Sequence, residues 1–239
     1  MFGVAFGNLF LGVPFGFYSD LRFHSQITLL SLLNPFGLLV GLVSLSMIVM
    51  HGAAWVNYKT EGAVQKRARA VLPFAALVFV ALFVAAGIWL TQLDGYAIAG
   101  TMAHDGPSNP LLKSVTRVPG GWMAGGAAWS AVALALAATA GAVLLRKRPL
   151  LCFLCSMLVP ASTIATAGLA LFPFLLPSSS DPNASLTVWD ASSSKLTLVV
   201  MLGAVALFLP LIIAYTGWAY RVMRGPVRAR DVSDNHSAY

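Results

Sequence analysis

Residues 70–93 read AVLPFAALVFVALFVAAGIWLTQL, a stretch without any Asp, Glu, Lys or Arg. A helix of this length crosses the ~30 Å hydrocarbon core of a bilayer, which takes roughly 20 residues. An ionised side chain at mid-bilayer costs at least ~2.5–3.5 kcal/mol on insertion scales, so uncharged stretches of this length indicate membrane spans. Four more stretches have a similar length and the same lack of charge: 33–57, 122–145, 150–174 and 196–220. Together with 70–93 they predict five full transmembrane helices.

The composition also indicates a membrane protein built from helices. Hydrophobic residues make up 58% of the chain and charged residues only 10%, whereas soluble domains carry about 25% charged residues. In lipid, backbone N–H and C=O groups need partners within the protein, which only helices and closed barrels provide. The apolar stretches are continuous and lack the alternation of barrel strands. We therefore expect an all-α polytopic membrane protein.

Basic residues are distributed unevenly over the connections between the five stretches. Short loops rich in Lys and Arg stay in the cytoplasm. This pattern predicts a cytoplasmic C-terminal tail, residues 221–239, and outer loops at 94–121 and 175–195. Under alternation of five spans, one side holds eleven of the fifteen basic residues: Lys59, Lys66, Arg67, Arg69, Arg146, Lys147, Arg148, Arg221, Arg224, Arg228 and Arg230. The other side holds Arg22, Lys113, Arg117 and Lys195.

The net charge of +7 would also suit a protein that binds nucleic acid. Here, however, the basic residues lie within a few positions of the span ends. Membrane topology and attraction to anionic lipid headgroups explain this placement. We therefore expect membrane lipids, and no nucleic acid, among the partners.

The N-terminal residues 1–16 (MFGVAFGNLFLGVPFG) are apolar but too short to span a bilayer. No basic residue precedes them, which argues against a secretory signal. They are interpreted as the outer end of a truncated helix, followed by a polar stretch at 18–28. The prediction is thus five full spans plus an N-terminal helix stub.

His51 lies near the inner end of the first full stretch and is the weak candidate for a functional residue. An intramembrane histidine suggests function by default, such as haem ligation or a proton relay. Trp55, Asn57 and Tyr58 follow within two turns, however, as in the aromatic belt of a membrane interface. The interfacial hydrogen-bonding role is favoured over a cofactor-binding role.

Two other pairs of residues suggest chemistry only at first sight. Cys152 and Cys155 form a C-x-x-C motif, but a redox or metal role needs a polar, accessible thiolate. Because both cysteines lie inside a span, we prefer to interpret them as small apolar side chains that pack on one helix face. His104 and Asp105 are a conceivable acid–base or metal pair, yet in such a turn-rich segment they more commonly stabilise the loop. No catalytic residue and no metal ligand is predicted.

Several residues have clear structural roles. Asn34 and Pro35 suit the cap and first turn of the first full span. Ser192, Ser193 or Ser194 is expected to cap the last span, with Asp190 favourable near its dipole. Pro160 and Pro210 lie within spans and should kink them. Asn183-Ala184-Ser185 matches a glycosylation sequon, a motif that is common by chance.

Longer segments resemble one family along the whole chain and in the same order: subunit II of bacterial cytochrome bd quinol oxidase. They are residues 3–15 (GVAFGNLFLGVPF), 33–43 (LNPFGLLVGLV), 94–110 (DGYAIAGTMAHDGPSNP), 169–198 (LALFPFLLPSSSDPNASLTVWDASSSKLTL) and the ending 235–239 (NHSAY).

The resemblance implies a nine-span subunit in two four-helix bundles plus one peripheral helix, in the bacterial inner membrane. It pairs with a subunit I that carries haem b and haem d. The complex oxidises quinol, reduces dioxygen to water and generates a proton-motive force. A bound quinone tail and a small single-span subunit are further expected partners. No residue of this chain inherits a haem-ligand role.

Matched in order, the chain begins in the fourth span, so 33–57 is expected to be the peripheral helix and 70–220 the second four-helix bundle. The resemblance thus implies that the family's first three spans and most of the fourth, with their acidic motifs, lie outside this sequence. We expect this fragment to be inactive by itself. The alternative is a stand-alone transporter or channel, which would need polar or broken helices meeting at the bilayer midplane.

Overall fold

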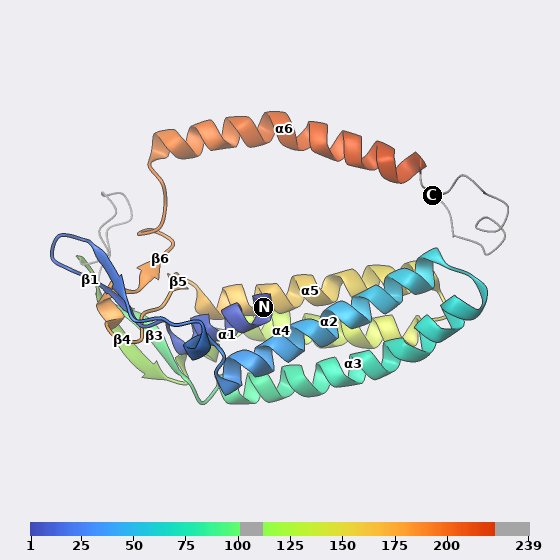
Figure 1. The fold of residues 1–239 in the computed structure, drawn as a ribbon, viewed down its shortest axis with the longest axis horizontal. Helices are drawn as coiled ribbons and strands as arrows, with labels where there is room; N and C mark the ends of the chain where they lie inside the picture. Colours follow the sequence, from blue (N-terminus) through green and yellow to red (C-terminus); the bar gives the residue numbers. More distant parts are fainter. Residues whose placement is uncertain (101–111, 223–239) are drawn as a thin grey trace.

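The computed structural model of the protein describes residues 1–100 and 112–222, and its helices run nearly parallel along the long axis (Figure 1). Five helices are long and apolar enough to cross a membrane, which confirms the predicted all-α polytopic fold class with an additional short N-terminal helix. The helices are α1 (Phe2–Leu11), α2 (Pro35–Lys59), α3 (Gly62–Leu90), α4 (Gly126–Leu144), α5 (Pro149–Leu171) and α6 (Lys195–Val222).

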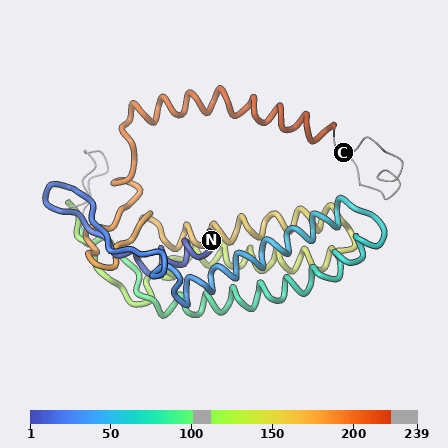
Figure 2. Tube along the Cα trace, in the orientation of Figure 1, coloured from blue at the N-terminus to red at the C-terminus, as the bar shows by residue number. Residues whose placement is uncertain are grey.

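The chain runs up and down between two distinct ends (Figure 2). At the basic end lie the α2–α3 and α4–α5 connections and the C-terminus of α6. The opposite end, here called the capped end, carries three two-stranded antiparallel sheets and three short 3-10 helices among the described residues. The strands are β1 (Phe15–Phe17), β2 (Phe23–Ser25), β3 (Asp94–Ala99), β4 (Ser114–Pro119), β5 (Phe174–Leu176) and β6 (Leu186–Thr187). The 3-10 helices are η1 (Leu30–Leu32), η3 (Gly121–Met123) and η4 (Pro182–Ala184).

Two of the predicted helix caps are confirmed. The Asn34 side chain accepts a hydrogen bond from the backbone N–H of Gly37 at 2.7 Å, and Pro35 occupies the first position of α2. The Ser194 hydroxyl accepts a hydrogen bond from the N–H of Thr197 at 3.4 Å at the start of α6. These contacts satisfy backbone donors that have no partner within a helix.

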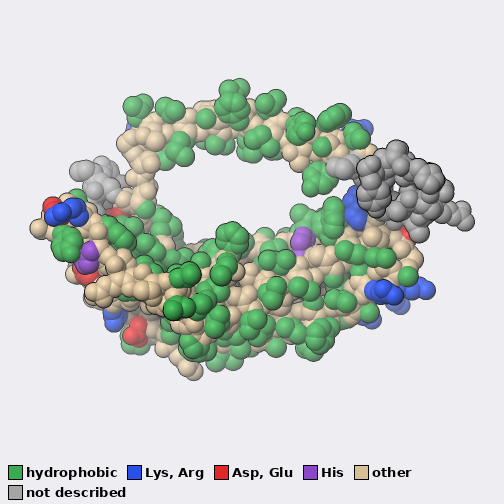
Figure 3. All heavy atoms as spheres, viewed as in Figure 1, with side chains coloured by type: hydrophobic (Ala, Val, Ile, Leu, Met, Phe, Trp, Pro, Cys, Tyr) green, Lys and Arg blue, Asp and Glu red, His purple; other side chains and the backbone are tan. Residues whose placement is uncertain are grey.

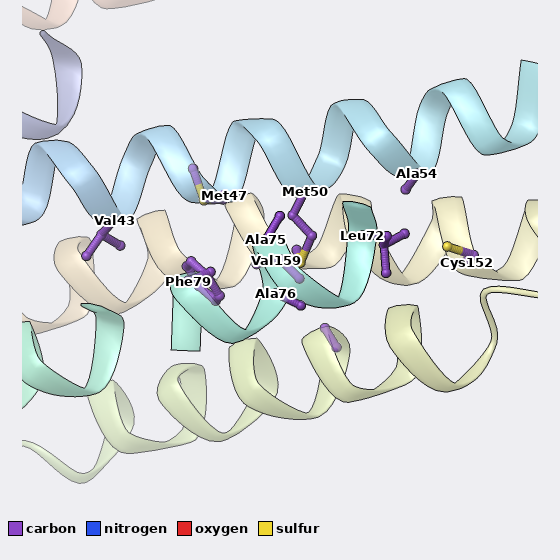
Figure 4. Close-up of a cluster of buried hydrophobic side chains, with 11 residues drawn as sticks. Val43, Met47, Met50, Ala54, Leu72, Ala75, Ala76, Phe79, Cys152 and Val159 are labelled. Carbon is purple, nitrogen blue, oxygen red and sulfur yellow. The ribbon is translucent and has the colours of Figure 1, made fainter. Parts of the chain in front are cut away.

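Helices α2 to α5 pack into the four-helix bundle. Its centre is an apolar cluster in which Met50, Leu72, Phe79 and Val159 have no exposed surface (Figure 4). The α4–α5 interface is built from small residues, since a side-chain carbon at Gly141 would lie 3.1 Å from the Cys155 sulfur. Small residues allow two helices in a membrane to approach closely. The buried alanines of α4 are Ala128, Ala131, Ala135, Ala138 and Ala142.

Helix α6 lies apart from this bundle (Figures 1 and 2) and has no buried residue. Residues 33–57 thus pack together with α3 and α5 in this structure, whereas α6 stands outside them. The expected grouping, with 70–220 as the bundle and 33–57 as the peripheral helix, stays a prediction. The packing of α2 depends on its polar partners. Its Asn57 is completely buried among bundle groups, whereas a side-chain carbon added at Gly203 or Gly217 of α6 would meet no neighbouring atom within 4 Å.

The short helix α1 crosses α2 at backbone contact distance. A side-chain carbon at Gly7 would lie 2.7 Å from the Cα atom of Gly37, and one at Gly3 would lie 2.5 Å from the Val40 carbonyl oxygen. Asn8 joins the same contact, because its side-chain oxygen accepts a hydrogen bond from Asn34 Nδ2 at 2.7 Å. The crossing thus combines small residues with a hydrogen bond between amide side chains.

Candidate functional site

His51, the candidate from the sequence, lies where α2 faces α5. Its Nδ1 atom is 3.0 Å from the Ser156 hydroxyl oxygen. That hydroxyl donates its only proton to the Phe153 carbonyl oxygen at 2.7 Å, so it accepts the hydrogen bond from His51 Nδ1–H. In the neutral ring this leaves a lone pair on Nε2.

An aromatic ring packs on this histidine, and two further rings pack on that one. The Phe153 ring stacks on His51 at 5.5 Å between centroids and on Tyr58 at 5.6 Å, and Trp55 lies 5.1 Å from the same ring. These contacts suit the interfacial hydrogen-bonding role favoured from the sequence. That role stays a prediction, as does the weaker cofactor-binding role.

Further along α2, Asn57 joins three helix ends and was not predicted as a key residue. Its Nδ2 donates to the Arg146 carbonyl oxygen at 3.0 Å, and its Oδ1 accepts from Arg69 Nε at 2.8 Å. Its backbone carbonyl accepts from Gln65 Nε2 at 3.0 Å. The signal in the sequence was an amide side chain at the end of an apolar run, which we interpreted as part of an interfacial belt.

Near the same end, a cavity of about 520 Å³ opens between α2 and α6. Its walls are aromatic and cationic side chains together with one glycine: Trp55, Tyr58, Lys59, Gly217, Tyr220 and Arg221.

A second cavity of about 420 Å³ lies toward the capped end of the bundle, between α1 and the four packed helices. Its lining is almost entirely apolar and includes Phe6, Phe36 and Trp129. Thr163 also lines it, and the hydroxyl of this residue is buried without a hydrogen-bond partner. The volume and lining suit a hydrocarbon chain, with one hydroxyl available to a polar atom.

Among residues 1–100 and 112–222, no group of three or more His, Cys, Asp or Glu side chains is placed to hold a metal ion. His51, the one histidine within the described helices, lines neither of the two cavities described above. Cys152 is buried, and Cys155 is half-buried against Gly141. This agrees with the predicted packing role. His104 and Asp105 lie outside the described residues.

The capped end holds a buried ion pair that the sequence did not reveal. Lys113 Nζ lies 2.8 Å from Asp190 Oδ2, and the two side chains are 1% and 3% exposed. The Thr187 hydroxyl donates to the same carboxylate oxygen at 2.7 Å. Asp190, expected to suit the dipole of the last helix, has its carboxylate engaged by Lys113 and Thr187. The pair ties the segment before α6 to the start of strand β4.

Tyr96 of strand β3 lies on the sheet that β3 forms with β4, next to Arg117. Burial raises the pKa of the Tyr96 phenol above its ordinary value of 10.0, and the charge and hydrogen bond of Arg117 partly oppose this shift. Arg117 also donates to the Ser179 carbonyl oxygen. The neutral phenol is therefore part of the packed cap.

Comparison with known proteins gives a consistent result. The family model for cytochrome bd terminal oxidase subunit II matches residues 1–223. The chain is 42% identical to cytochrome bd-I ubiquinol oxidase subunit 2 of Escherichia coli K12, over 99% of this chain and 65% of that protein. It is 42% identical to the probable cytochrome oxidase subunit 2 of Haemophilus influenzae, over 100% of this chain and 65% of that protein. The identity with the Bacillus subtilis cytochrome bd ubiquinol oxidase subunit 2 is 27%, over 96% of this chain and 60% of that protein. The chain thus spans less than two thirds of the length of these relatives.

Proposed function

The chain belongs to the cytochrome bd terminal oxidase subunit II family, and on this premise we propose that it acts in a cytochrome bd-type quinol:oxygen oxidoreductase. Its role is to scaffold a haem-bearing subunit I. The complex oxidises quinol, reduces dioxygen to water and generates a proton-motive force. The observation that carries this proposal is the family match over residues 1–223.

The chemistry of the site supports a scaffolding role. The one histidine in the described helices, His51, lines neither cavity, and the proposal assigns haem b and haem d to subunit I. The apolar cavity between α1 and the bundle fits a hydrocarbon chain, and a quinone tail is the occupant that suits the function. Neither assignment requires a catalytic residue in this chain.

The charge distribution supports an orientation. Lys59, Arg69 and Arg146 lie at the basic end together with Arg221. Loops rich in Lys and Arg stay in the cytoplasm, so the proposal places the basic end and the C-terminus inside and the capped end outside. The membrane is the bacterial inner membrane, and a small single-span subunit is a further proposed partner.

A stand-alone transporter or channel is not favoured. Transporters bind their substrates at broken helices near the bilayer midplane, whereas α2 to α5 are continuous helices packed on an apolar core. Family membership also favours the oxidase subunit.

Co-purification tests the proposal. A tagged version of this chain would be expressed with and without a cytochrome bd subunit I in cells that lack their own bd oxidases. We expect subunit I, with its haem b and haem d spectra, to be retained only when both chains are present. Haem bound to this chain alone, or failure to retain subunit I, would contradict the proposal. Oxygen uptake driven by quinol is a second readout. We propose that this chain paired with subunit I shows no such uptake, because it matches only 65% of the length of the Escherichia coli subunit.

A further inference from the structure

The cavity between α2 and α6 has the chemistry of an anion site at a membrane surface. Of its six lining residues, two are cationic, Lys59 and Arg221, and none is acidic. Figure 3 shows basic side chains gathered at this end of the molecule. The cavity volume of about 520 Å³ is larger than a simple inorganic anion needs.

The wall on the α2 side is held by ring contacts. Lys59 Nζ lies 5.5 Å from the Trp55 ring centroid and 5.8 Å from that of Tyr58. The Trp55 and Tyr58 rings both pack on Phe153 of α5. The ammonium group therefore lies over a platform that the bundle fixes, and this limits the side-chain entropy lost when an anion binds.

The wall on the α6 side is open enough to admit a ligand. A side-chain carbon added at Gly217 would meet no neighbouring atom within 4 Å, so the backbone there is accessible. Tyr220 and Arg221 follow in the last turn of α6. Both walls lie at the ends of spanning helices, the depth at which lipid headgroups are found.

We propose that this cavity binds the phosphate group of an anionic phospholipid. Lys59 and Arg221 contact the phosphate oxygens from two helices, and Trp55, Tyr58 and Tyr220 pack on the glycerol and the first methylene groups. Basic pockets between transmembrane helices bind anionic lipid headgroups in this way. The aromatic rings and the surplus volume favour a lipid over free phosphate. Such a lipid would link α6 to helices α2 to α5.

Native mass spectrometry of the full chain from nanodiscs of phosphatidylcholine and phosphatidylglycerol tests this site. A basic residue near an anionic surface contributes about 1 kcal/mol, or roughly fivefold in affinity. The double variant Lys59→Gln, Arg221→Gln should therefore retain roughly thirtyfold less phosphatidylglycerol. The matched control is Lys66→Gln, Arg67→Gln, which removes the same charge from the start of α3 outside the cavity and should change retention less than about twofold.

Two further measurements make each outcome decisive. The charge-conserving variant Lys59→Arg, Arg221→Lys should retain the lipid, which separates charge from misfolding. Inorganic phosphate at the concentration of the lipid should not displace it. Unchanged retention in the Gln double variant would overturn the proposal. Equal loss in the control pair would show diffuse attraction in place of a site, and displacement by free phosphate would show an inorganic anion site. The test uses this chain alone and does not depend on the oxidase assignment.

Discussion

Helices α3 and α6 have nearly equal length, 29 and 28 residues, and nearly equal mean hydropathy. Yet 28% of the most apolar window of α3 is buried, whereas none of the α6 window is. Hydropathy therefore determines which segments enter the membrane and leaves open which helices pack together. Lipid tails are as apolar as leucine, so helix association depends on close packing and on hydrogen bonds.

The bundle has the features that drive such association, and α6 lacks them. The hydroxyl of Ser156 and the side-chain amide of Asn57 are buried and have partners within the bundle. On α6 the large side chains are exposed, including Phe208 at 56% and Tyr215 at 68%. Substitutions that exchange or remove these features test whether the contrast between bundle and α6 holds.

The largest effect is expected where the segment before α6 is anchored to the cap. Asp190→Ala leaves the Lys113 ammonium group buried without its carboxylate, and such a loss costs about 3–5 kcal/mol of stability. Unfolding in detergent, followed by circular dichroism, measures the change. The exposed pair of Asp20 and Arg22 provides the control, and Asp20→Ala should cost less than about 1 kcal/mol. Equal effects of the two variants would contradict the burial argument.

Two phenylalanines provide the direct comparison of bundle and α6. Phe79 is completely buried in the bundle core, whereas Phe208 is 56% exposed. Phe79→Ala leaves a cavity and should lower the free energy of unfolding by about 3 kcal/mol, whereas Phe208→Ala should change it by less than about 0.5 kcal/mol. Steric-trap unfolding of the chain in bicelles measures both. Comparable losses for the two variants would show that Phe208 of α6 packs against other helices in the bicelle.

Much of the fold follows from the sequence, and the remainder depends on contacts that no local pattern encodes. The five spans and the Asn34 cap could be predicted, because chain length, the absence of charge and cap chemistry are local properties. Which spans form the bundle was expected from the family resemblance, since hydropathy alone does not say which helices pack together. The deciding contacts, such as that between Asn57 and Arg146, join residues 89 positions apart.

The site was predicted only in part, for the same reason. His51 and its aromatic neighbours were identified, since they lie close together on a single helix. The partner Ser156 lies 105 positions away, and nothing in its local sequence distinguishes it from other serines within the spans. The Lys113–Asp190 pair was missed because each residue lies in a separate turn-rich loop.

A smaller effect is expected at the crossing of α1 and α2. Gly7→Leu places its first side-chain carbon within 2.7 Å of the Gly37 Cα atom, and overpacking of this kind costs about 1–3 kcal/mol. The matched control is Gly203→Leu in α6, where no atom lies within 4 Å. Thermal unfolding in detergent compares the two. A destabilising Gly203→Leu would show that a neighbour packs against α6 at that position.

The smallest effect is a pH dependence confined to the cap. Burial raises the pKa of Tyr96 above 10.0 in the folded protein, so the folded state holds the phenolic proton more tightly than the unfolded chain. The resulting stability is fully present below about pH 10 and is lost as the pH rises through the raised pKa. Trp122, whose ring lies 5.5 Å from that of Tyr96, reports the opening of the cap by fluorescence. Tyr96→Phe should reduce the loss of stability at alkaline pH. Tyr18→Phe, at a position where the native side chain is 55% exposed, should leave that loss unchanged. If Tyr96 titrated at or below pH 10 in the folded chain, the cap would be hydrated, and the bundle would be the one part of the described chain with a dry interior.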